Sequence, residues 1–147
     1  MSELRELYQE TILEHSRKPR NFGILETANH KAEGYNPLCG DHYTVFLDVK
    51  DGAIQNLSFE GSGCAISKAS ASMMTQSLKG KTTAEAEALF TKFHDLVTGH
   101  GDPAAEMGKL AVFGGVSEFP LRVKCATLAW HTLRAALRGE QQAVSTE

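Results

Sequence analysis

The chain contains three cysteines, and an aspartate lies close to the first of them. Cys39 and Asp41 are separated only by Gly40, Cys64 follows a glycine-rich segment, and Cys125 lies near the C-terminal end. Three thiolates and one carboxylate form a four-ligand set that suits zinc or an iron–sulfur cluster. The residue types therefore make these four side chains the candidate functional site.

Other interpretations of the cysteines remain open at this point. The N-terminal residues carry acidic side chains and lack the apolar segment of a signal peptide, which predicts a cytoplasmic protein with reduced thiols. An odd number of cysteines also argues against a disulfide framework. Buried, inert thiols are the simplest alternative, because the spacing is not a compact C-x-x-C pattern. A Cys39 nucleophile would need a histidine partner, and the sequence marks none among His42, His94, His100 and His131.

Local sequence predicts how the four side chains could converge. Gly40 allows a tight turn in which Cys39 and Asp41 point toward one place. Cys64 opens a predicted helix, and the positive end of the helix dipole favours its thiolate. Cys125 is predicted in the first turn of the last helix, where the same effect is weaker. The carboxylate of Asp41 is the hardest of the four ligands, and we infer that it is the most easily displaced.

Bulk composition indicates a single domain over residues 1–147 with a frayed tail at about 140–147. The chain has 147 residues, of which 41% are hydrophobic and 22% are charged, which is enough for a core. Its net charge of -3 gives no basic footprint for nucleic acid. No apolar run approaches the roughly 18 residues of a membrane helix.

Hydrophobic periodicity and turn signals predict the elements that position the site. Asp51-Gly52 is a strong hairpin signal between two alternating strands. Thr82 and Glu85 form a capping-box pattern at a helix start. Glycines and prolines in 99–120 predict a loop with one short helix at about 104–110. Helices are expected at 2–17, 65–78, 82–97 and 121–137, and strands at 28–35, 42–50 and 53–60.

Early strands and late helices predict an α+β fold, a small antiparallel sheet with helices packed on one face. In the strand at 53–60, however, Ile54 is out of phase with Leu57 and Phe59. Met73 and Met74 are predicted to fill the core rather than to bind metal.

Two long motifs resemble the IscU-like iron–sulfur cluster assembly family. They are NPLCGD at 36–41 and FEGSGCAISKASASMM at 59–74, and the third cysteine comes from RVKC at 122–125. The resemblance extends from about residue 7 to about residue 137. Lys124 stands where scaffold-type members carry a histidine, and 61 positions separate Cys64 from Cys125, a longer distance than in the scaffold branch. Both features are similar to the SufU branch.

The resemblance implies a zinc-dependent sulfurtransferase for iron–sulfur cluster assembly. It would accept persulfide sulfur from a SufS-type cysteine desulfurase, a pyridoxal-phosphate enzyme, and would supply downstream scaffold proteins. The resemblance implies zinc ligation by Cys39, Asp41, Cys64 and Cys125, with Cys39 as the persulfide acceptor. Arg122, one helical turn before Cys125, is a candidate stabiliser of the thiolate or partner of Asp41. Whether such a sulfur carrier acts as an enzyme in its own right stays open.

Two other functions remain as alternatives. The same four side chains could hold a transient [2Fe–2S] cluster on a scaffold. They could also form a structural zinc site with no chemistry.

Overall fold

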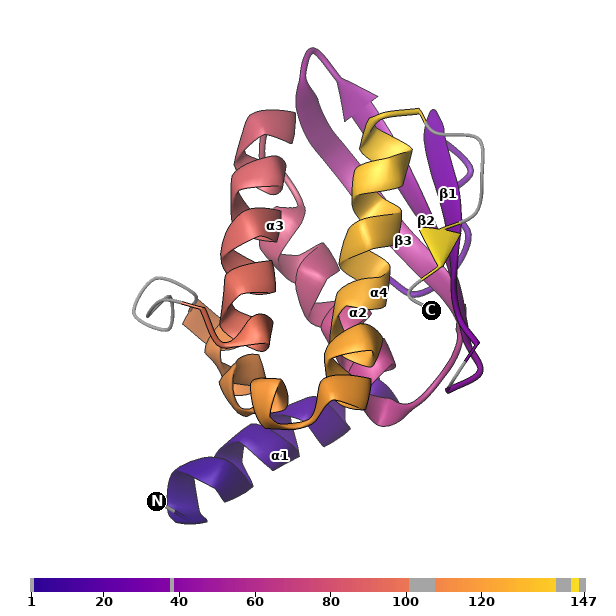
Figure 1. Ribbon diagram of the computed structural model, residues 1–147. Helices are drawn as coiled ribbons and strands as arrows, with labels where there is room; N and C mark the ends of the chain where they lie inside the picture. The colour runs from indigo at the N-terminus through magenta and orange to yellow at the C-terminus, as the bar shows by residue number, and fades with distance from the viewer. Residues whose placement is uncertain (1, 38, 101–107, 140–143, 146–147) are drawn as a thin grey trace.

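The computed structural model describes residues 2–37, 39–100, 108–139 and 144–145, with side chains from residue 9 onward (Figure 1). The elements are α1 (Ser2–Arg17), β1 (His30–Asn36), β2 (Asp41–Lys50), β3 (Ala53–Ser62), α2 (Ala65–Leu78), α3 (Thr83–Thr98), the 3₁₀ helix η2 (Gly108–Glu118), α4 (Pro120–Leu137) and β4 (Val144–Ser145).

The sheet has the strand order β3-β2-β1-β4, and the helices lie on one side of it (Figure 1). The α+β prediction is therefore confirmed. Strands β1, β2 and β3 are antiparallel as predicted, but β4 pairs parallel to β1, which makes the sheet mixed. Val144 and Ser145 thus form strand inside a segment that was predicted to be a frayed tail; the rest of that tail lies outside the described residues. Among the described residues, no helix combines the length and apolar character needed to cross a bilayer.

Strand alternation determines which side chains face the helices. In β2 the inward face carries Tyr43, Val45 and Leu47, all completely buried. Asp41 has the same parity as these residues, so the pleat directs its carboxylate into the interior, where it is 2% exposed. On β1 the same rule buries Asn36, which pairs directly with Asp41 across the strands.

A β-bulge explains why the predicted alternation of β3 was imperfect. The register between β2 and β3 shifts between Asp48 and Val49, because Asp48 faces Asn56 whereas Val49 faces Ile54. One extra residue on β3 changes the phase, so Ile54 and Leu57 are both buried despite their odd spacing.

The helical layer packs on large aromatic side chains and small residues. The ring of Phe93 on α3 stacks on Trp130 of α4 with centroids 4.5 Å apart, and Phe113 of η2 meets Phe93 edge-on at 5.6 Å. Met73 and Met74 are at most 1% exposed, so their assignment to the core is confirmed.

Several boundaries differ from the prediction by one or two residues, and the differences at η2 and α4 have a physical reason. The Gly-rich segment contains η2, whose buried residues Leu110, Phe113 and Val116 recur every third position, the period of a 3₁₀ helix. The predicted helix at 104–110 falls largely on undescribed residues. Helix α4 begins at Pro120 rather than at Leu121, because proline is well suited to the first helical position.

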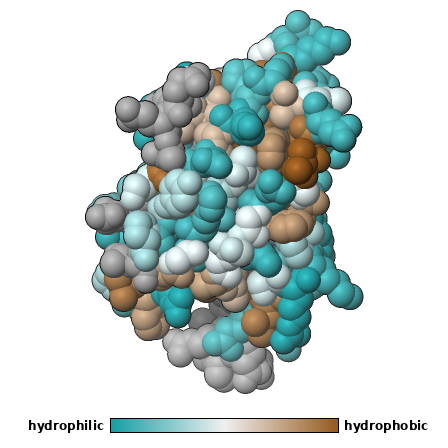
Figure 2. Space-filling view, turned by 90° about the vertical axis from the view of Figure 1, so that its right-hand side faces the viewer, coloured by the Kyte–Doolittle hydropathy of each residue, from teal (hydrophilic) through white to brown (hydrophobic). Residues whose placement is uncertain are grey.

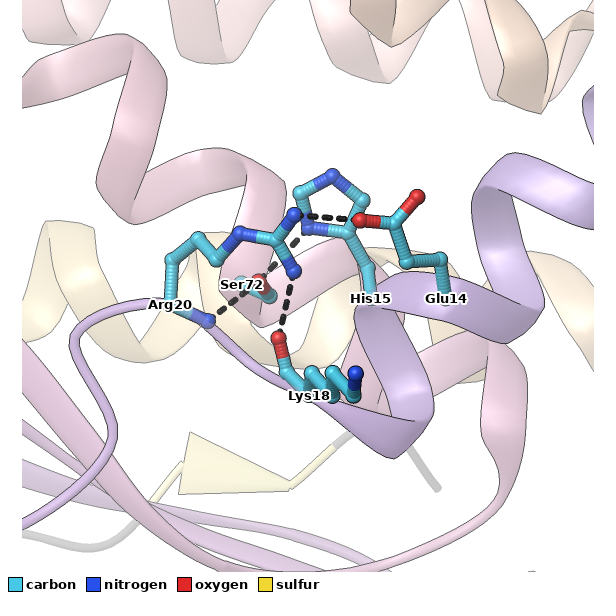
Figure 3. A network of polar contacts seen from close by, with 5 residues as sticks. All are labelled: Glu14, His15, Lys18, Arg20 and Ser72. Atoms are coloured by element: carbon cyan, nitrogen blue, oxygen red, sulfur yellow. Dashed lines mark hydrogen bonds and ion pairs between the residues drawn. The ribbon is translucent and has the colours of Figure 1, made fainter.

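A polar network attaches α1 to α2 (Figure 3). The buried His15 ring shares a hydrogen bond of 2.7 Å with Ser72 Oγ, which also accepts the backbone N–H of Arg20 at 2.8 Å. The Arg20 guanidinium in turn pairs with Glu14 at 2.6 Å and bonds the Lys18 carbonyl at 2.5 Å. Burial, with a smaller contribution from Arg20, lowers the pKa of His15. A neutral histidine therefore fixes the end of α1 against the middle of α2.

A second histidine, His131 on α4, makes the unfolding free energy depend on pH. Its ring packs against Phe90 with centroids 5.2 Å apart. Desolvation, then the charges of Arg134 and His94, lower its pKa to about 4 from an ordinary value of 6.5. Between these two values the folded state binds fewer protons than the unfolded chain, so stability is lost as the pH falls through that window. The pKa shift corresponds to at most about 3 kcal/mol of unfolding free energy.

We expect His131→Gln to remove most of this acid sensitivity, because glutamine does not titrate. The measurement is the unfolding free energy of the metal-free protein in urea at both ends of the pH window, since packing losses common to both ends cancel in the difference. His100→Gln, at an exposed position, is the matched control. An equal pH difference in wild type and His131→Gln would contradict the role given to this histidine.

Candidate metal centre

The four predicted ligands come from one end of the sheet and from two helices. Cys39 lies in the turn between β1 and β2, and Asp41 is the first residue of β2. The turn is closed by hydrogen bonds from the N–H groups of Cys39 and Gly40 to the carbonyl of Asn36, at 3.2 and 2.9 Å. Gly40 has a φ of 73°, a left-handed conformation that glycine adopts without strain.

Three of the four side chains form a compact set of donors. The ligand atoms of Cys39, Asp41 and Cys125 all lie within 4.8 Å of one another. The two sulfurs of Cys39 and Cys125 are 3.3 Å apart and are free thiols. Two thiol sulfurs and a carboxylate oxygen in such proximity fit the ligand types that zinc takes in proteins.

Cys64 lies beside this set without belonging to it. It is the N-cap of α2, and its backbone N–H donates to Asp41 Oδ1 at 2.8 Å. Its own Sγ accepts the backbone N–H of Ser67 at 3.5 Å. The backbone of Cys64 is thus tied to the Asp41 carboxylate, and ligation by its thiol stays a prediction.

The pKa values of Cys64 and Cys125 are shifted in opposite directions in the metal-free protein. A hydrogen bond with Cys125, assisted by the N–H of Ser67, lowers the pKa of Cys64 to about 5. The pKa of Cys125 is raised, first because it shares its proton with Cys64 and second because it is buried. The prediction of a Cys64 thiolate agrees with this direction. The weaker lowering predicted for Cys125 is wrong, because α4 begins at Pro120 and Cys125 lies in its second turn beside another sulfur.

Hydrogen bonds hold the Asp41 carboxylate more firmly than we expected for the hardest of the four ligands. Oδ1 accepts the N–H of Cys64, and Oδ2 accepts a hydrogen bond from Asn36 Nδ2 at 3.3 Å. A buried carboxylate with both oxygens bonded is costly to move. The structure therefore argues against Asp41 as the most easily displaced ligand. Cys39 is half-exposed, and among the described residues the Cys125 thiol is the one group that hydrogen-bonds to its sulfur.

Arg122 lies exposed on the first turn of α4. Its pKa is raised, mainly by a hydrogen bond with Cys125 and then by the charges of Cys64 and Cys125. This direction agrees with a guanidinium that acts on the sulfurs, and stabilisation of a thiolate by Arg122 stays a prediction.

The histidines have other contacts. The His42 ring is exposed, stacks on Tyr35 with centroids 4.2 Å apart, and lies 3.9 Å from Glu33. His94 and His131 pack against each other and Phe90 between α3 and α4. These contacts argue against a Cys39–histidine nucleophile.

Sequence reasoning missed four residues that support the site. Asn36 bridges two candidate ligands, while Tyr43 OH and Ser67 Oγ share a hydrogen bond of 2.8 Å beside Cys64. Gly63 lies against these groups. A signal was present for two of them: Asn36 begins the turn motif, and Ser67 is three residues after a helix-capping cysteine.

Comparison with known proteins identifies the relatives of this chain. The family model of the NifU-like N terminal domain matches residues 7–126. The iron–sulfur cluster assembly scaffold protein IscU of Streptococcus pyogenes serotype M1 is 38% identical over 139 residues, 94% of this chain and 87% of the relative. The zinc-dependent sulfurtransferase SufU of Bacillus subtilis strain 168 is 38% identical over 136 residues, 92% of each chain.

A solved structure of a SUF-system protein from Fervidobacterium islandicum AW-1 has the same fold. It superimposes with a TM-score of 0.84 at 35% identity, and the match covers 90% of this chain and 97% of that one.

The space around Gly63 generates a prediction about the site. A Cβ at this position would overlap Asp41 Oδ1 and would lie 2.6 Å from both Ser67 Oγ and Tyr43 OH. We expect Gly63→Ala to push the carboxylate aside, to lower stability by about 1–3 kcal/mol and to weaken zinc binding. Thermal unfolding and competition with a zinc chelator measure the two effects. Gly115→Ala is the control, because nothing lies within 4 Å of a Cβ there. Wild-type zinc affinity in Gly63→Ala would contradict this geometry.

Proposed function

The chain belongs to the family of NifU-like N-terminal domains, and on this premise we propose that it is a zinc-dependent sulfurtransferase. In this function it accepts persulfide sulfur from a cysteine desulfurase, a pyridoxal-phosphate enzyme, and supplies it to iron–sulfur cluster assembly. A relative at 38% identity that carries the name of such a sulfurtransferase supports the proposal.

The observation that carries the proposal is that hydrogen bonds restrain the four candidate metal ligands unequally. Asp41 and Cys125 receive a hydrogen bond from the same buried amide, and Cys64 receives one from the N–H of Ser67. Cys39 is partly exposed, and among the described residues its thiol hydrogen-bonds only with the Cys125 thiol. A sulfur acceptor needs one thiolate that can reach a partner while its neighbours stay in place.

Zinc would be held by Cys39, Asp41, Cys64 and Cys125, and when bound it keeps thiols deprotonated near neutral pH. Arg122 would place a positive charge beside the anionic sulfur at the surface. The half-exposed turn that carries Cys39 gives a donor protein access to its sulfur.

The transfer itself is thiolate exchange at sulfur. The Cys39 thiolate attacks the outer sulfur of a persulfide on the donor's cysteine. A new S–S bond forms at Cys39 as the bond between that sulfur and the donor cysteine breaks, and the donor leaves as a thiolate. No net oxidation or reduction occurs, because a persulfide is consumed and a persulfide is formed.

We expect Cys39→Ala to abolish sulfur acceptance, because the attacking thiolate is removed. Alanine release by the cognate desulfurase, with and without the zinc-loaded protein, measures the acceptor effect, and mass spectrometry locates the added sulfur. Gln55→Ala, at an exposed position near the hairpin end of β3, is the control. Full stimulation of the desulfurase by Cys39→Ala would contradict the proposed role of Cys39.

A second function, the assembly of a [2Fe–2S] cluster as cargo, is favoured by the scaffold names of several relatives, including the one from Streptococcus pyogenes. Three thiolates and a carboxylate could bind such a cluster. Lys124 argues against it, because a lysine next to Cys125 replaces the histidine of scaffold-type members.

We therefore expect anaerobic reconstitution with iron and sulfide to give the wild type no stable cluster that can be passed to an apo-ferredoxin. Lys124→His should increase the yield by restoring an imidazole next to Cys125. Visible absorption and circular dichroism follow the cluster. A stable, transferable cluster on the wild type would make the scaffold the better description.

A further inference from the structure

Asn36 is a buried amide at the end of β1 that touches the donor set without belonging to it. Its side chain is completely buried, since the pleat of β1 places it on the helix-facing side with Ala32 and Gly34. It lies directly opposite Asp41 in the strand register.

Hydrogen bonding allows only one orientation of the Asn36 side-chain amide. Its Nδ2 donates to Asp41 Oδ2 at 3.3 Å and to Cys125 Sγ at 3.5 Å. The opposite orientation would place the amide oxygen against two acceptors. Oδ1 then has no hydrogen-bond partner in the part of the chain that the structure describes. A buried acceptor without a partner is unfavourable and calls for an explanation, and the two bonds made by Nδ2 supply one.

The two bonds join groups that otherwise belong to separate elements. Asp41 begins β2 and Cys125 lies on α4, so one NH₂ group couples the sheet to the helix at the site. Among the described residues this amide forms no hydrogen bond with the Cys39 side chain, although the backbone carbonyl of Asn36 accepts the N–H of Cys39 and so forms its turn.

We propose that Asn36 is a positioning residue that fastens Asp41 and Cys125 to each other, so that both stay in place when Cys39 turns outward to react. This role rests on the proposed function. It assigns selectivity to the site: Cys39 is released in preference to Cys125 because only Cys125 is held by the amide.

The order in which the cysteines react tests the proposal without measuring sulfur transfer. The protein is loaded with one equivalent of zinc and treated with iodoacetamide, and peptide mass spectrometry follows each cysteine over time. In the wild type we expect Cys39 to be modified first and Cys125 to stay protected. In Asn36→Ala and Asn36→Leu we expect Cys125 to react about tenfold faster relative to Cys39, the factor that corresponds to one lost hydrogen bond to a charged sulfur.

The two variants separate the hydrogen bonds from packing. Leucine keeps most of the side-chain volume but removes the donor, whereas alanine removes both. Asn56→Leu on β3 is the matched control, since its side chain bonds to its own neighbour Leu57 rather than to the site. The rate of zinc release to a chelator is recorded for each variant, and circular dichroism of each confirms that the comparison is made on folded protein.

The outcomes distinguish the positioning role of Asn36 from the proposed function of the protein. Faster modification of Cys125 in both Asn36 variants and not in Asn56→Leu supports the positioning role. An effect in Asn36→Ala alone would assign it to lost volume and would overturn the role of the amide. An unchanged ratio of Cys125 to Cys39 modification, with zinc still protecting the wild type, would overturn it as well. Zinc that protects no cysteine in the wild type would instead overturn the proposed function, and the positioning role with it.

Discussion

The burial of the Asp41 carboxylate is the constraint on which the arrangement of the site depends. Strand alternation turns this side chain toward the core, where an uncompensated charge is costly. Compensation comes from two places, the N–H of Cys64 at the start of α2 and the amide of Asn36 on β1. One oxygen therefore fixes the helix start against the sheet, and the other connects the sheet to the sulfur of Cys125 on α4.

The packing of α2 on α4 keeps the two sulfur-bearing helices in register. Helix α2 is rich in alanine and serine, so α4 can approach it closely (Figure 1). Ser70 Oγ donates to the carbonyl of Ala126 at 2.6 Å and accepts from the indole N–H of Trp130 at 3.1 Å. Figure 2, which shows the right-hand side of Figure 1, has a mixed surface with separate apolar patches.

Short sequence motifs correctly predicted the turns and helix starts that depend on neighbouring residues. Asp51-Gly52 predicted the hairpin, and the capping box of Thr82 and Glu85 is present in full. The β-bulge was visible in the sequence as the out-of-phase Ile54. The pairing of Val144 with Gly34 depends on a partner more than 100 residues away, which a local pattern does not encode. The same division holds at the site. Cysteine and aspartate could be selected by type, but the firm hold on Asp41 and the raised pKa of Cys125 depend on tertiary contacts.

The asymmetry of the site bears on the choice between carrying sulfur and building a cluster. A scaffold benefits when all four ligands are equally restrained, because a bound cluster is lost if any one ligand leaves it. A sulfur acceptor gains from one ligand that moves against three that do not. Here the donors from Asn36, Ser67 and the Cys64 backbone all act on groups other than the Cys39 thiol. Among the described residues the Cys39 thiol hydrogen-bonds only with another thiol, and the charge of the exposed Arg122 acts on the sulfurs. This distribution of hydrogen bonds supports the proposed acceptor role, since it restrains the Cys39 thiol less than the other three candidate ligands.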